Sequence, residues 1–185
     1  MAHFVDINKI RETIFTLNSI ILSGELFAQK YNVGIEFAPS LYPRKKYWLT
    51  LKKIISHSCL ELSVLMRNSK ELLDVNSHKI DTHKILMCAD LINSNVKNYD
   101  FIFIANKIIH AKSFQLRAVG SNKYEEAFEW WNGRIEISGT DQKQKPWSLN
   151  LNVSDWLGTL ELFLDETEAI LHSLQNSSED ILRNN

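Results

Sequence analysis

Apolar residues recur at intervals of three and four along several stretches of the chain, which places them on one face of a helix. In the first stretch these positions are Ile7, Ile10, Ile14, Leu17 and Ile21. The last stretch repeats leucines in the same way from Leu157 to Leu174. The spacing predicts five helices, at residues 6–31, 44–67, 81–96, 98–111 and 154–174, with residues 68–77 as a connection that has helical character at 70–73.

The period changes from 3.6 to 2 after His110, because apolar and polar residues alternate from Phe114 to Ala118. Asn132-Gly133 then separates two strand-like runs, and this dipeptide is the strongest short signal for a two-residue hairpin turn. Residues 147–151 alternate again. We therefore predict a small antiparallel β-meander at about residues 112–151, with a hairpin turn at Asn132-Gly133.

These patterns predict a mainly α protein of the α+β class. We expect a helical bundle of four to five helices, with the β-meander inserted before the last helix. A length of 185 residues and an apolar content of 44% fit a single globular domain. We expect this domain to span residues 1–174, and the Ser- and Asn-rich tail at 175–185 to be frayed.

Charge and cysteine usage narrow the class of protein. The 21 Lys and Arg residues nearly balance the 22 Asp and Glu residues, so no global field attracts nucleic acid or an anionic membrane. The start of the chain lacks a signal-peptide pattern, and no apolar run has bilayer length, which predicts a cytoplasmic protein without a membrane partner. Cys59 and Cys88 are isolated within apolar segments, which indicates two buried reduced thiols. We expect no metal and no cofactor, because neither zinc-ligand spacing nor a glycine-rich phosphate loop is present.

The stretch from Phe101 to His110 has the pattern of an amphipathic helix, with an apolar face and a polar sector. At 100° per residue its apolar residues except Phe103, Ala105 included, fall in an arc of about 160°. Asn106, Lys107 and His110 share the remaining sector, and Asn106 and His110 are four residues apart, so their side chains can touch. From residue types alone the polar sector favours the solvated face of a helix at the edge of the core, and a functional pair is the alternative.

A helical bundle whose late helix carries Ala105-Asn106-Lys107-Ile108-Ile109-His110 resembles the HEPN superfamily of helical domains, which are common in prokaryotic defence and toxin systems. Active members carry Arg, a polar residue, three variable residues and His. The resemblance implies a metal-independent ribonuclease in which two protomers join their motifs across a dimer interface. It assigns the polar position to Asn106 and the catalytic histidine to His110, whereas Ala105 stands at the arginine position.

The missing arginine bears directly on the chemistry. RNA cleavage by this route needs a base for the 2′-OH proton, an acid for the leaving oxygen and a cation on the phosphate. Histidine titrates near neutral pH, so His110 suits either proton transfer, and Asn106 can hold its ring. Alanine cannot clamp a phosphate as arginine does. Lys107 is the nearest substitute cation, and Arg117 on the following strand is a remoter one.

Two functions follow from these residues. The sequence favours a HEPN-like interaction or regulatory module, a homodimer linked to prokaryotic stress or defence, without the full ribonuclease site. The alternative is a ribonuclease or RNA-binding protein that uses His110, Asn106 and a substitute cation. RNA or another protein is then the partner.

A basic stretch near the second helix is a further candidate for RNA binding. Its members are Arg44, Lys45, Lys46, Lys52 and Lys53, with Trp48 among them. Such a surface can hold a phosphate backbone and stack a base. The other interpretation is a solvated helix face with the tryptophan turned inward. Cations early in a helix oppose its dipole, which keeps the binding hypothesis open.

Trp130 and Trp131 are adjacent on a predicted strand and therefore point to opposite faces of the sheet. A small meander buries one face against helices. Either both rings are covered, or one of them is exposed and serves as an interface anchor.

Overall fold

The computed structural model describes residues 6–33, 43–75, 86–91, 97–120 and 128–183. Within these ranges it contains four helices and five strands. Their bounds are α1 (Ile7–Lys30), α2 (Arg44–Val75), β1 (Leu86–Leu91), β2 (Lys97–Asp100), α3 (Phe101–Ile109), β3 (Ser113–Gly120), β4 (Glu129–Thr140), β5 (Pro146–Asn152) and α4 (Val153–Arg183).

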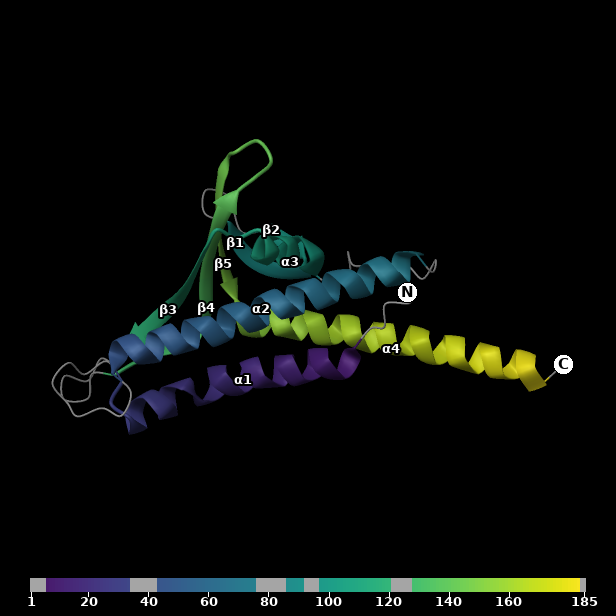
Figure 1. The fold of residues 1–185 in the computed structure, drawn as a ribbon, viewed down its shortest axis with the longest axis horizontal. Helices are drawn as coiled ribbons and strands as arrows, with labels where there is room; N and C mark the ends of the chain where they lie inside the picture. The colour runs from purple at the N-terminus through teal and green to yellow at the C-terminus, as the bar shows by residue number, and fades with distance from the viewer. Residues whose placement is uncertain (1–5, 34–42, 76–85, 92–96, 121–127, 184–185) are drawn as a thin grey trace.

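Of the three long helices, α1 lies against both α2 and α4, and the sheet rests against one side of them (Figure 1). The short helix α3 lies beside α2 on the sheet side, and the β4–β5 hairpin projects away from the helices. This confirms the predicted mainly α fold of the α+β class, with an antiparallel meander before the last helix. The shared core draws on every helix and on the sheet, through side chains such as Ile14, Leu17, Ile55, Leu62, Phe101, Ile104, Ile135, Leu151, Leu160 and Phe163.

The sheet has the strand order β2-β1-β5-β4-β3, and all its pairings are antiparallel. Along β4, buried residues alternate with exposed or half-buried ones from Trp131 to Thr140. Ile135 and Ile137 lie opposite Leu151 and Leu149 of β5, and all four are buried. One face of the meander therefore packs on the helices, as its alternating sequence predicts.

The predicted hairpin turn at Asn132-Gly133 is wrong, because β4 runs straight through these residues. The dipeptide instead forms a bulge: the β3–β4 register shifts between the pairs Leu116↔Ile135 and Ala118↔Trp131. Gly133 has a φ of +89°, a left-handed conformation that glycine adopts at little cost. The Asn-Gly dipeptide thus marks a position with a positive φ, and in this structure that position lies in a β-bulge instead of a hairpin turn.

Other boundaries also differ from the predictions. The predicted helix at residues 81–96 is wrong, since residues 86–91 form β1, and the helix expected from residue 98 begins only at Phe101, after β2. Helix α2 continues through the predicted connection to Val75, and α4 continues to Arg183, past its predicted end at residue 174. None of the described helices combines the length and apolar content that crossing a bilayer requires.

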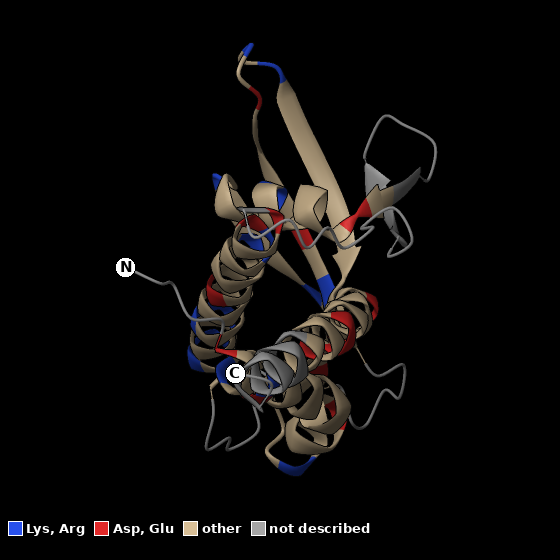
Figure 2. Cartoon of the chain, turned by 90° about the vertical axis from the view of Figure 1, so that its right-hand side faces the viewer, with Lys and Arg blue, Asp and Glu red and all other residues tan. Residues whose placement is uncertain are grey.

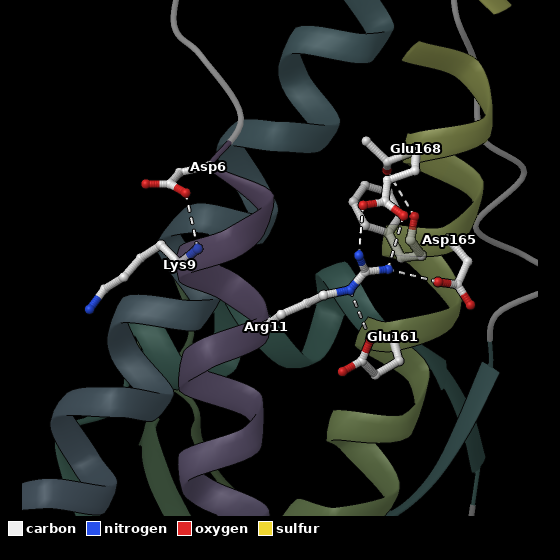
Figure 3. Close-up of polar contacts among 8 residues, drawn as sticks. Asp6, Lys9, Arg11, Glu161, Asp165 and Glu168 are labelled. Carbon is white, nitrogen blue, oxygen red and sulfur yellow. Dashed lines mark hydrogen bonds and ion pairs between the residues drawn. The ribbon is translucent and has the colours of Figure 1, made fainter. Parts of the chain in front are cut away.

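An arginine on α1 ties that helix to α4 (Figure 3). The Arg11 guanidinium donates to both carboxylate oxygens of Glu168, at 2.6 and 3.0 Å, and to Asp165 at 3.0 Å. Glu161 lies 3.7 Å from Arg11 Nε. Because these carboxylates follow one face of α4, the cluster fixes how the two helices lie along each other.

Candidate functional site

Helix α3 positions the Asn-His pair that the sequence singled out. The Asp100 carboxylate caps the helix by accepting a hydrogen bond from the Ile102 N–H at 2.5 Å. Ala105 is fully buried, as the apolar arc predicts. His110 is the exposed C-cap residue, and its N–H donates to the Asn106 carbonyl oxygen at 3.1 Å. The pair therefore lies one turn apart at the outer end of α3.

An open groove of about 530 Å³ lies between the end of α3 and the last turns of α2. Asn106 and His110 line it from α3, together with Ile102. The α2 side contributes two cations and two carboxylates: Arg67, Lys70, Glu71 and Asp74. The structure thus supplies cations beside His110, from a helix that the motif does not include.

Both of these cations are paired with carboxylates of their own helix. Arg67 Nε lies 2.8 Å from Glu71 Oε1, and Lys70 Nζ lies 2.5 Å from Asp74 Oδ2. Each pair joins residues four apart on α2. The formal charges of these four side chains therefore cancel at the groove.

The two substitute cations named from the sequence lie elsewhere. Lys107 Nζ is 4.3 Å from the centroid of the Trp147 ring on β5 and 5.3 Å from that of the Phe103 ring. Its ammonium group therefore makes cation–π interactions with these two rings. Arg117 on β3 is ion-paired with Glu136 of β4. Neither residue lines the groove that holds His110.

The groove cations could not be recognised from the expected helix at residues 44–67, because the groove lies along the two further turns by which α2 continues toward Val75. A signal for them was present: Arg67 and Glu71, and also Lys70 and Asp74, are spaced i,i+4, as ion pairs on a continuous helix are. Extending the helix by two turns would have placed all four side chains on a helix surface.

The basic stretch at the start of α2 divides into paired and exposed cations. Arg44 donates to both oxygens of Glu129 on β4, each at 2.9 Å. The four lysines, Lys45, Lys46, Lys52 and Lys53, are exposed. Trp48 is half-buried, with its ring edge-on to Tyr47 at a centroid distance of 5.3 Å. In Figure 2 the Lys and Arg residues, in blue, lie at several separate places on the helices and on the sheet.

The adjacent tryptophans differ in exposure, and both pack against the helical core. Trp131 is buried and donates its indole N–H to the Arg134 carbonyl oxygen at 2.7 Å. Trp130 is half-buried and packs against Phe128, with a centroid distance of 5.5 Å. Trp131 is therefore covered within the chain, whereas part of the Trp130 residue remains exposed.

Within the described part of the chain, no three His, Cys, Asp or Glu side chains gather as metal ligands. A scan of family models and searches of curated proteins and of solved structures find no match to this chain. The HEPN resemblance therefore rests on residues 105–110 and the helical layout, and it stays a prediction.

Proposed function

We propose that this protein is a HEPN-like interaction or regulatory module without the full ribonuclease site, a cytoplasmic homodimer in a prokaryotic stress or defence system. The observation that carries the proposal is the charge arrangement at the His110 groove. The arginine position holds the buried Ala105, and the cations that line the groove, Arg67 and Lys70, are each bound to a carboxylate.

A phosphate that enters this groove meets Glu71 and Asp74 as well as the two cations. Each arginine or lysine that it approaches there is already paired with a carboxylate, and that carboxylate repels it. Active ribonuclease sites instead present preorganised cations to the phosphate, which need no rearrangement during the reaction. The groove thus favours a role other than phosphate chemistry.

The exposed apolar surface of α1 supports an interaction role. Phe15, Leu22 and Leu26 are 75%, 81% and 69% exposed, and their spacing of seven and four residues aligns them along one stripe. A row of large exposed apolar side chains is typical of a protein interface. Figure 1 shows α1 and α3 on opposite sides of α2, so a dimer through this row keeps the two His110 grooves apart.

One observation favours the alternative, a metal-independent ribonuclease. The groove brings a carboxylate (Glu71), a histidine (His110) and an arginine (Arg67) together, and these are the types of group that serve as base, acid and phosphate cation. For this chemistry Arg67 must leave Glu71 when RNA binds. His110 then protonates the leaving 5′ oxygen after Glu71 takes the 2′-OH proton.

An RNA cleavage assay with EDTA, at protein excess and low salt, separates the two functions. Under our proposal the wild-type protein leaves single-stranded and structured RNA intact. Under the alternative it produces 2′,3′-cyclic phosphate ends, and His110→Ala abolishes cleavage while Arg67→Ala slows it by roughly 100-fold or more. Lys107→Ala is the matched control, because it removes a cation of α3 that lies outside the groove. Cleavage that depends on His110 would overturn the proposal.

A further inference from the structure

A second, apolar groove lies between α1 and the first half of α2. It has a volume of about 200 Å³, and buried Trp131 of β4 lines it beneath the two helices. Gly24 lets α1 approach β4 closely here, since an added Cβ would lie 3.1 Å from the Trp131 carbonyl oxygen. The remaining lining residues are Ile20, Ser23, Phe27, Tyr47, Thr50, Leu51 and Ile54.

The α2 edge of this groove is basic. On a helical wheel, Lys46 and Lys53 lie next to Thr50 on the groove side, whereas Lys45 and Lys52 lie about 100° further round. Residues 44–60 contain no Asp or Glu. Among the described residues, Arg44 of this stretch forms an ion pair with Glu129. The four lysines of the stretch are exposed.

We infer that this groove binds an amphipathic helix of a partner protein, with its apolar face on Ile54 and Phe27 and with Asp and Glu along the flank that faces Lys46 and Lys53. This inference rests on the proposed interaction function and names the chemistry of the partner. Charge complementarity carries it: an apolar groove with a cationic edge selects an apolar helix with an acidic flank. Acidic groups there also offset the unfavourable lysines in the first turn of α2.

The dimensions of the groove exclude larger small-molecule ligands. Pockets that enclose drug-sized ligands measure roughly 300–1,000 Å³, so this groove takes anchoring side chains instead. Ile54, which lines the groove and is 42% exposed, offers aliphatic surface to such side chains. RNA gains most from exposed aromatic faces, and the Trp48 ring packs edge-on against Tyr47. Protein is therefore the favoured partner.

A peptide display experiment tests this inference on the full chain. The library presents helices of about 20 residues with Leu fixed at i, i+3, i+4 and i+7, and with Glu, Lys, Ser or Gln at the flanking positions. We expect selected peptides to be rich in Glu on one flank. In fluorescence titrations, Lys46→Glu/Lys53→Glu and Ile54→Asp should each weaken binding by about tenfold or more.

The matched control is Lys45→Glu/Lys52→Glu, which makes the same charge change away from the groove and should weaken binding by less than about threefold. Circular dichroism confirms that each variant is folded. Selected peptides with neutral or basic flanks, or equal losses in the two double variants, would overturn the inference. So would tight binding of single-stranded RNA that depends on Lys46 and Lys53, or a change of oligomeric state in that variant, which would assign the groove to a second copy. A failure here leaves the RNA cleavage result, and hence the proposed function, unaffected.

Discussion

Arg11 joins α1 to α4 through three carboxylates, and this makes it the residue whose charge we expect to contribute most to stability. Its hydrogen bond to Glu168 raises the pKa of Arg11, against partial desolvation, and the charges of Glu161 and Asp165 add to the increase. A cation whose pKa is raised on folding stabilises the fold below its unfolded pKa and loses this only as the pH rises through the folded value. The contribution is therefore fully present at neutral pH.

Arg11→Met should lower the free energy of unfolding by about 1 kcal/mol, because the three carboxylates lose the cation that they share. The loss is no larger because the cluster is partly exposed to solvent. Urea denaturation measures the change, which should shrink at high salt. Arg67→Met is the comparison, since it removes one ion pair within a single helix and should cost only about 0.3–0.5 kcal/mol. Equal effects of the two substitutions would contradict the role of the cluster.

Cys59 is a buried thiol, as the sequence predicted, whereas the side chain of Cys88 lies outside the described residues. Burial raises the pKa of the Cys59 thiol from 9.0 to about 12. At pH 8 it should resist iodoacetamide in the native protein and react once urea unfolds the chain. Peptide mass spectrometry measures the labelling of Cys59 separately from that of Cys88.

Because the pKa of the Cys59 thiol is raised in the folded state, burial of this thiol contributes stability that is present below pH 9 and is lost as the pH rises toward 12. Rapid labelling of native Cys59 would show that the core around it opens readily.

Two glycines in different elements should respond oppositely to alanine. Gly133→Ala should destabilise by about 1–2 kcal/mol, because φ at the bulge is +89° and the new Cβ would lie 3.3 Å from Ile21 Cγ2. Gly158→Ala on α4 meets no atom within 4 Å and should stabilise by about 0.5–1 kcal/mol. Urea midpoints of both variants test this. A neutral Gly133→Ala would mean that β4 can adopt another register at the bulge.

The elements that the sequence predicted well are those with a long, regular period. The first and last helices each repeat apolar residues over several turns, and tertiary packing keeps that face inward. The prediction of a helix over residues 86–91 was wrong because a short apolar run fits a buried strand as well as a helix. The pairing of this run with β2 and β5 makes it a strand. The groove beside His110 was not predictable, since it depends on how α3 lies against α2.

At the scale of the whole molecule, the apolar row and the two grooves lie on distinct surfaces. The row follows α1, the apolar groove lies between α1 and α2, and the His110 groove lies between α2 and α3. The motif predicts kinship from six residues, but it does not predict which surface forms a dimer. A test of the dimer must therefore address the α1 row independently of His110.

We expect the wild-type protein to be a dimer through the α1 row, and Leu22→Glu/Leu26→Glu to convert it to a monomer that keeps its circular dichroism spectrum. Both side chains are exposed in a single chain, so glutamate there disturbs the interface without disturbing the core. Sedimentation velocity measures the mass. Leu162→Glu on α4 is the control, because it adds a charge at an exposed leucine outside the row and should leave the dimer intact. A dimer that survives the double substitution but dissociates in His110→Glu would place the interface at the α3 groove, and it would bring two His110 side chains together as the ribonuclease alternative requires.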